Sequence, residues 1–239
     1  MRPRELHADY QIAAIANSLP RPPANVLDVG CGRGFLASVL RGAGYDVTAI
    51  DPDTDAVEAA RARGVGAVRS GLSEFEGAGF DAVIFSRSLH HIEDLSDAVD
   101  RAAHLLDDQG CLVVDEFDWG AADESTAAWF YGTSHLLTVA CVIECASDDE
   151  EELSGPLARW SAEHADLHTG IDMLDAVGAR FDLVDSARLE GLWVYLCQEL
   201  DDTDEGGRVA EALRSLERDL LSAGTLAPVG LRLTARKRR

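Results

Sequence analysis

The sequence is poor in basic residues. Its 239 residues include 21 lysines and arginines against 43 aspartates and glutamates, so the formal net charge is −22 at pH 7. A surface of this charge repels phosphate backbones and anionic lipids, and we therefore expect neither nucleic acid nor a membrane as a partner. The one basic cluster, RLTARKRR at residues 232–239, is short. Lysine occurs once, at Lys237, which fits a high-GC genome or a salt-adapted host equally well.

Long apolar runs and an export signal are also missing. No run approaches the roughly 18 residues that a membrane span requires, and the first residues, MRPRELHADYQ, turn polar too early for a signal peptide. We therefore expect a cytoplasmic protein. The cysteines are odd in number, widely spaced and without a CxxC pair, which predicts reduced thiols. Cys141 and Cys145 with His135 leave a metal site conceivable, but buried thiols are favoured and no metal is predicted.

Apolar runs typical of buried strands alternate with helical patterns through the first half of the chain. Such alternation predicts an α/β fold with a parallel sheet covered by helices on both faces. We expect strands at 25–30, 45–51, 65–70, 80–86 and 111–117, and helices at 5–19, 35–43, 52–63 and 95–106.

The pattern changes after Trp119. Helical patterns follow at 123–145, 168–178 and 207–222, an acidic loop is expected at 146–156, and strands at 180–189 and 226–238 complete the sheet. The predicted fold is a Rossmann-like, doubly wound, mostly parallel sheet of seven strands. We expect one domain over residues 1–239, with 119–170 as a helical insertion that forms a lid over an acceptor site.

A glycine-rich turn follows the first predicted strand. Glycines at 30, 32 and 34 form GxGxG, with Asp28 just before them and Asp51 at the end of the next strand. Parallel sheets bind ligands at the carboxyl ends of their strands, where this turn lies. Residues without a Cβ let a backbone approach a ligand closely, and one carboxylate can accept hydrogen bonds from both hydroxyls of a ribose. In the dinucleotide pattern GxGxxG, Phe35 would have to be a glycine.

These motifs resemble those of the class I S-adenosylmethionine-dependent methyltransferases, in particular the small-molecule type. The resemblance is carried by LDVGCGRG, AID, FDAVIFSRSLHHIED and LLDDQGCLVVDEF, and by GLRLTARKR near the end of the chain. It implies S-adenosyl-L-methionine as cofactor and S-adenosyl-L-homocysteine as product. The cofactor-binding residues that it implies are Asp28, Gly30, Cys31, Gly32, Gly34, Asp51, Pro52, Gly71, Leu72 and Ser86. Many relatives carry an aspartate for the adenine amino group near Gly71 and Leu72, and this chain does not.

Methyl transfer from a sulfonium is an in-line displacement, so the protein mainly supplies proximity and alignment. A base is needed only where the nucleophile must lose a proton. His90, His91 and Glu116 are the candidate catalytic residues, because they lie at the ends of the fourth and fifth predicted strands. Structural histidines and a surface acid remain the alternatives.

The aromatic residues after the fifth strand occupy the place where relatives have their acceptor lid. Two interpretations are open: these side chains enclose an acceptor, or they only pack the inserted helix onto the sheet. The residues are Trp119, Trp129, Phe130 and Tyr131. The predicted function is methyl transfer to a small-molecule acceptor, neutral or cationic, with oxygen slightly favoured over nitrogen or carbon. An NAD-dependent oxidoreductase and a non-catalytic methyltransferase-like binding protein are the alternatives, and a homodimer is left open.

Overall fold

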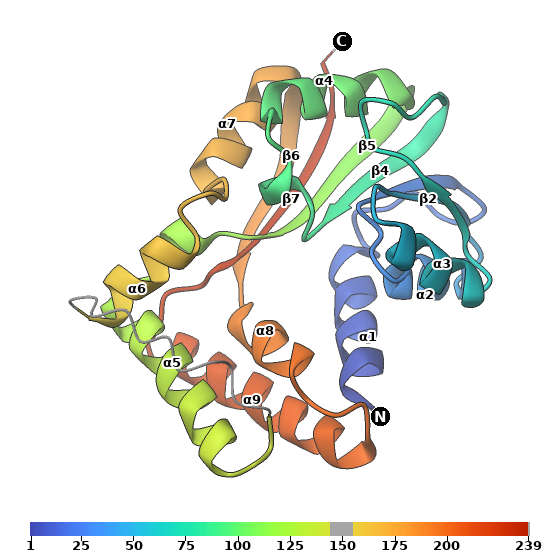
Figure 1. Cartoon of the computed structure of the whole chain (residues 1–239). Helices are drawn as coiled ribbons and strands as arrows, with labels where there is room; N and C mark the ends of the chain where they lie inside the picture. The colour runs from blue at the N-terminus through green and yellow to red at the C-terminus, as the bar shows by residue number, and fades with distance from the viewer. Residues whose placement is uncertain (144–154, 239) are drawn as a thin grey trace. The chain divides into compact units, whose positions relative to one another are not determined.

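A computed structural model describes residues 1–143 and 155–238, and it contains a seven-stranded sheet (Figure 1). The strands follow the order β3-β2-β1-β4-β5-β7-β6 across the sheet. Their bounds are β1 (Asn25–Val29), β2 (Asp46–Asp51), β3 (Gly66–Arg69), β4 (Phe80–Ser86), β5 (Leu106–Phe117), β6 (Phe181–Leu189) and β7 (Gly230–Lys237). Strand β1 pairs in parallel with β2 and β4, and β2–β3 and β4–β5 are parallel as well. The order reverses direction beside β1, which makes this the point where doubly wound sheets bind ligands.

Two hydrophobic clusters cover the two faces of the sheet. In β4, Val83 and Phe85 belong to one cluster and Ala82 and Ile84 to the other, because successive side chains of a strand point to opposite faces. The first cluster packs against α4 (Leu95–Leu105) and α7 (Gly170–Arg180), and the second against α1 (Pro3–Ile15), α2 (Phe35–Gly42) and α3 (Thr54–Ala62). Burial on both faces explains why the central strands are almost continuously apolar.

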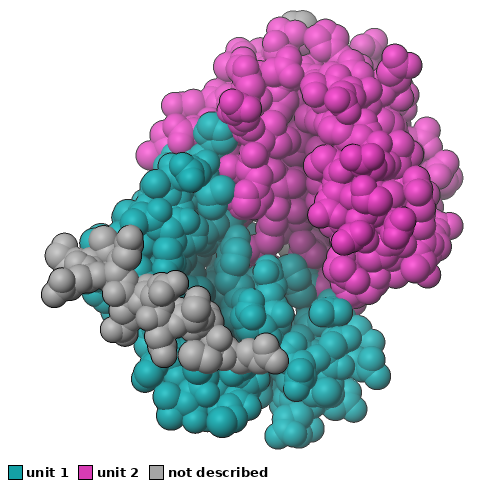
Figure 2. All heavy atoms as spheres, in the orientation of Figure 1, with its two compact units in different colours: residues 1–7, 117–169, 188–230 teal, residues 8–116, 170–187, 231–239 magenta. Residues whose placement is uncertain are grey.

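The chain divides into two compact units, drawn in different colours in Figure 2. Unit 2 comprises residues 8–116, 170–187 and 231–239, and so contains β1 to β4 and most of β5. Unit 1 comprises residues 1–7, 117–169 and 188–230. It holds α5 (Glu124–Val139), α6 (Pro156–Glu163), α8 (Leu192–Gln198) and α9 (Asp204–Ser222). Whether the chain acts as one domain with a lid at 119–170 stays a prediction.

A buried carboxylate organises part of unit 1. Glu217 of α9 accepts hydrogen bonds from the backbone N–H groups of Gly191, Leu192 and Trp193, at 2.7, 3.0 and 2.8 Å. These groups open α8 and lack an acceptor within their own helix, so Glu217 caps α8 from a distant part of the sequence. Burial raises the pKa of the Glu217 carboxyl, and the three N–H groups oppose that shift.

The predicted strands and the helices of the first half are confirmed, with ends that differ by at most about five residues, as at β5, which begins at Leu106 and not at Cys111. Two helices, α6 and α8, were not predicted. Most of the predicted acidic loop at 146–156, and Cys145, lie outside the described residues. Cys111 and Cys197 are buried as predicted and Cys31 is partly buried, but Cys141 is exposed, so the prediction of a buried thiol is wrong there. None of the helices in the described part of the chain has the length and apolar character that crossing a bilayer requires.

Candidate functional site

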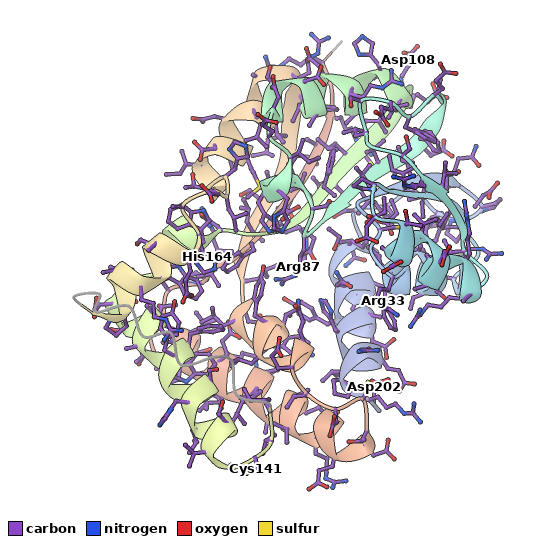
Figure 3. The ribbon with its side chains drawn as sticks, viewed as in Figure 1. Arg33, Arg87, Asp108, Cys141, His164 and Asp202 are labelled. Carbon is purple, nitrogen blue, oxygen red and sulfur yellow. The ribbon has the colours of Figure 1, made fainter. Side chains whose placement is uncertain are left out.

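Unit 2 contains a cavity of about 620 Å³ at the carboxyl ends of β1, β2, β3 and β4 (Figure 3 shows the side chains). This volume lies within the usual range for sites that bind small molecules and cofactors. Its walls come from the turns that follow the four strands and from the beginning of α4. The lining residues include Gly30, Gly32, Asp51, Pro52, Gly71, Leu72, Ser73, Arg87, Ser88, His91, Ile92, Glu93, Asp94 and Asp97.

The three glycines of the turn after β1 are required for different reasons. A Cβ added at Gly30 would lie 2.5 Å from the Cβ of Ser88, and one at Gly34 would lie 2.6 Å from the Cβ of Ala60. Both positions therefore need glycine because neighbouring elements pack against them. Gly32 has φ +52° and no atom within 4 Å of an added Cβ, and it lines the cavity. Of the three, only Gly32 combines an open face with a place at the cavity wall where a ligand could approach the backbone.

Asp51 is held in position by the turn that it faces. Its Oδ2 accepts a hydrogen bond from Gly32 N at 2.8 Å, and its Oδ1 accepts one from Asp53 N at 2.9 Å. A carboxylate oxygen can accept two hydrogen bonds, so each oxygen keeps a lone pair for a further donor. Asp51 lines the cavity, and its two oxygens can receive a pair of neighbouring hydroxyl groups.

Asp28 lies beneath the same turn and is almost fully buried, with 1% of its surface exposed. Its Oδ2 has no hydrogen-bond partner among the described residues. Burial, with a smaller contribution from the charge of Asp51, raises the pKa of Asp28 to about 7. Buried polar atoms normally have partners, so a carboxylate in this state is suited to a cationic or hydrogen-donating ligand.

Glu116 at the end of β5 organises the turn after β4. Its Oε1 accepts hydrogen bonds from Ser88 N and Leu89 N, at 2.7 and 2.6 Å, and its Oε2 accepts one from His90 Nδ1 at 2.5 Å. Both side chains are buried, with Glu116 1% and His90 3% exposed. The surface-acid alternative for Glu116 is therefore wrong. Neither Glu116 nor His90 lines the cavity.

His91 is placed differently from its neighbour. Its side chain is exposed and lines the cavity, and its ring centroid lies 4.1 Å from that of His90. Partial burial and the neighbouring His90 lower the pKa of His91 below its ordinary value of 6.5, while Glu116 acts in the opposite direction. A histidine that is neutral near pH 7 and faces a cavity can accept a proton.

Six of the ten predicted cofactor residues line the cavity: Gly30, Gly32, Asp51, Pro52, Gly71 and Leu72. Cys31, Gly34, Asp28 and Ser86 do not, and the Oγ of Ser86 accepts a hydrogen bond from Gln11 Nε2 at 2.7 Å. Arg87 and the acids at the start of α4 line the cavity as well and were not predicted from the sequence. Arg87 stands inside the FSRSLHH motif, but no rule of spacing or composition singled it out.

The aromatic residues after β5 belong to unit 1. Trp119, Trp129, Phe130 and Tyr131 pack against a cluster formed by Phe117, Ala127, Trp160, Leu192 and Val229. The indole of Trp160 donates to the carbonyl of Trp119 at 2.9 Å, and its ring lies 5.2 Å from that of Phe130. Asp118 beside them is buried and paired with Arg188, so it is not a surface acid. These contacts favour the packing interpretation, and a role as a lid stays a prediction.

Comparison with known proteins gives a consistent result. A family model described as a methyltransferase domain matches residues 4–143. An uncharacterized methyltransferase of Mycobacterium bovis is 41% identical over 162 residues, which cover 65% of this chain and 77% of that protein. The ubiquinone biosynthesis O-methyltransferase of Xylella fastidiosa strain M23 is 30% identical over 193 residues, which cover 75% of this chain and 74% of that protein.

Solved structures share the fold. One is the geranyl diphosphate C-methyltransferase of Streptomyces coelicolor in complex with Mg²⁺, geranyl-S-thiolodiphosphate and S-adenosyl-L-homocysteine. It matches with a TM-score of 0.61 at 15% identity, over 96% of this chain and 76% of that one. At this identity the similarity concerns the fold alone.

Proposed function

Because the chain belongs to the class I S-adenosylmethionine-dependent methyltransferases, we propose that it methylates a hydroxyl group of a small-molecule acceptor. Family membership favours this enzyme class over the NAD-dependent and non-catalytic alternatives. The cofactor supplies an activated methyl group on a sulfonium. The residues of the chain then have to bind the cofactor, orient the acceptor and take up the proton that a hydroxyl releases.

We assign the cofactor to the cavity in unit 2. Three observations support this assignment: both Asp51 oxygens keep acceptor capacity, the backbone of Gly32 is open to the cavity, and the buried Asp28 carboxylate has an oxygen without a hydrogen-bond partner among the described residues. Asp51 would accept from the two ribose hydroxyls. Gly71 and Leu72 line the cavity after β3 and would face the adenine.

We propose oxygen as the methylated atom because of where His91 lies. Its ring lines the cavity and its pKa is lowered, so the neutral form that accepts a proton predominates at pH 7. Glu116 accepts hydrogen bonds from the adjacent His90 and from the backbone of the turn, and these bonds hold His91 in place. Glu116 itself does not line the cavity. The name of the Xylella fastidiosa relative, an O-methyltransferase, supports the same choice. Glu93, Asp94 and Asp97 at the cavity wall favour a neutral or cationic acceptor.

The proposal is tested by supplying methyl-labelled S-adenosylmethionine with three sets of small acceptors that differ only in the nucleophile. The sets carry a hydroxyl, an amine or an acidic C–H group on the same scaffolds. We expect label in the hydroxyl-bearing acceptors, with one S-adenosylhomocysteine formed per methyl group, measured by mass spectrometry. Label confined to amines or to carbon would contradict O-methylation and leave the cofactor assignment unaffected.

Asp51→Ala tests the location of the cofactor. The variant should weaken the binding of S-adenosylhomocysteine by about 1.5–3 kcal/mol, the range of a hydrogen bond to a charged group, as measured by isothermal titration calorimetry. Asp46→Ala is the matched control, because Asp46 is an exposed aspartate at the other end of β2. Equal affinity in the two variants would count against the ribose assignment.

A further inference from the structure

The order of the strands sets the direction in which an adenosyl compound can lie in the cavity. Strands β3, β2, β1 and β4 are consecutive in the sheet, and the cavity is lined by Leu72 after β3, Asp51 at the end of β2, Gly32 after β1 and Arg87 after β4. A nucleoside with its ribose at Asp51 and its base at Leu72 must direct its 5′ substituent across β1 toward β4. Arg87 therefore lies at the end of the cavity that receives the amino-acid portion of the cofactor.

Arg87 brings a positive charge to a cavity wall that otherwise contains several carboxylates. It is the single lysine or arginine among the described residues that line the cavity, and the carboxylates in the same wall are Asp51, Glu93, Asp94 and Asp97. Without Arg87, a ligand carboxylate in this cavity would meet only like charges. An arginine can meet a carboxylate with two parallel hydrogen bonds, which suits it to this task.

The backbone and the neighbouring strand position Arg87. Its φ is +56°, in the left-handed region that residues other than glycine rarely adopt and that is found at binding sites more often than elsewhere. Its N–H donates to the carbonyl of Asp115 on β5 at 2.9 Å. The Asp115 carboxylate is buried and interacts electrostatically with both Arg87 and Arg232, and Arg232 Nη2 lies 3.3 Å from its Oδ1. Asp115 therefore helps to hold the guanidinium of Arg87 near the carboxyl end of β4.

We propose that Arg87 binds the α-carboxylate of the cofactor and thereby selects adenosyl compounds that carry the amino-acid group. This inference rests on the assignment of the cofactor to the unit 2 cavity made under the proposed function. An amino-acid group also carries an ammonium, and the buried carboxylate of Asp28 next to the glycine turn adds negative charge that favours it, although Asp28 does not itself line the cavity.

The test compares two ligands that differ in the amino-acid group. S-adenosylhomocysteine carries it, and 5′-methylthioadenosine does not. The variant Arg87→Asn removes the guanidinium, and asparagine adopts a positive φ more readily than most residues other than glycine, so the backbone is disturbed little. We expect calorimetry to show an affinity for S-adenosylhomocysteine about 10- to 100-fold lower than in the unaltered chain, with the affinity for 5′-methylthioadenosine within about two-fold.

Two further variants sharpen the comparison. Arg87→Lys keeps the charge but not the planar fork and should lose less affinity than Arg87→Asn. Arg33→Gln is the matched control, because Arg33 is an exposed arginine of the same glycine turn that does not line the cavity (both arginines are labelled in Figure 3). It should bind both ligands as the unaltered chain does.

The inference is overturned if Arg87→Asn leaves the affinity for S-adenosylhomocysteine unchanged, a result that would assign the guanidinium to the acceptor or to Asp115 alone. It is also overturned if both ligands lose affinity equally, since the carboxylate would then not be what Arg87 binds. Asp51→Ala separates this failure from failure of the cofactor assignment. Binding of both ligands should weaken in Asp51→Ala if the cavity is the cofactor site, whatever Arg87 does.

Discussion

Glu116→Ala should lower the free energy of unfolding by about 3–5 kcal/mol, because it leaves three buried hydrogen-bond donors without their acceptor and each such loss costs about 1–3 kcal/mol. The substitution takes away the acceptor of three donors: the backbone N–H groups of Ser88 and Leu89 and the Nδ1 of His90. All three lie in the turn that follows β4 and are buried. Chemical denaturation measures the loss directly.

Two controls separate the hydrogen bonds from the charge. Glu116→Gln keeps an oxygen for the two backbone donors and should lose clearly less stability than Glu116→Ala. Asp108→Ala removes an exposed acid from the same strand and should change the free energy of unfolding by less than about 0.5 kcal/mol. A Glu116→Ala protein as stable as the Asp108→Ala protein would show that the buried network does not hold the turn.

The parts of the site that the sequence predicts are those that depend on local pattern. The strand that ends at Asp28 and Val29 is apolar and short, the turn after it is rich in glycine, and the next strand ends in Asp51. Each feature is read within a window of a few residues, and chain order alone then brings the turn and Asp51 to the same edge of a parallel sheet. The 2.8 Å hydrogen bond between Gly32 N and Asp51 Oδ2 is the result.

The remaining features depend on contacts between residues far apart in the sequence. Gly34 needs to be glycine because Ala60 of α3 packs against it, and no pattern around Gly34 reveals that neighbour. Glu116 looked like one more acid in a very acidic chain, and only its burial against Ser88 and His90 distinguishes it.

Helix α8 was missed for a related reason. Its sequence, LWVYLCQ, is apolar all round, so it shows no helical period, and the cap that starts it comes from Glu217 some 25 residues later. A short apolar run without periodicity reads equally well as a strand or a buried helix. Arg87 was missed because no local sequence pattern reveals its left-handed backbone or its place in the cavity wall.

His91→Gln should reduce kcat about 10²- to 10⁴-fold if His91 is the general base for a hydroxyl acceptor. Glutamine keeps much of the size and polarity of histidine but cannot take up a proton at neutral pH. Binding of S-adenosylhomocysteine should change much less than kcat, which separates loss of the base from loss of the cofactor. His104→Gln is the matched control, because His104 is an exposed histidine on α4 outside the cavity, and it should retain full activity. A His91→Gln enzyme with unchanged kcat would remove His91 from the chemistry.

The pH dependence of kcat distinguishes a base from a histidine that only shapes the cavity. A general base acts when it is neutral, so activity should rise with pH through the pKa of His91 and then stay level. Partial burial and the neighbouring His90 lower the pKa of His91 below 6.5, although the charge of Glu116 acts in the opposite direction. The other titratable groups near His91 in the cavity wall include the exposed acids Glu93 and Asp94. The midpoint of the rise should therefore lie below pH 6.5, and the rise should disappear in His91→Gln. A midpoint above 6.5, or one that survives the substitution, would assign the proton transfer to another group and leave His91 a role in positioning the acceptor.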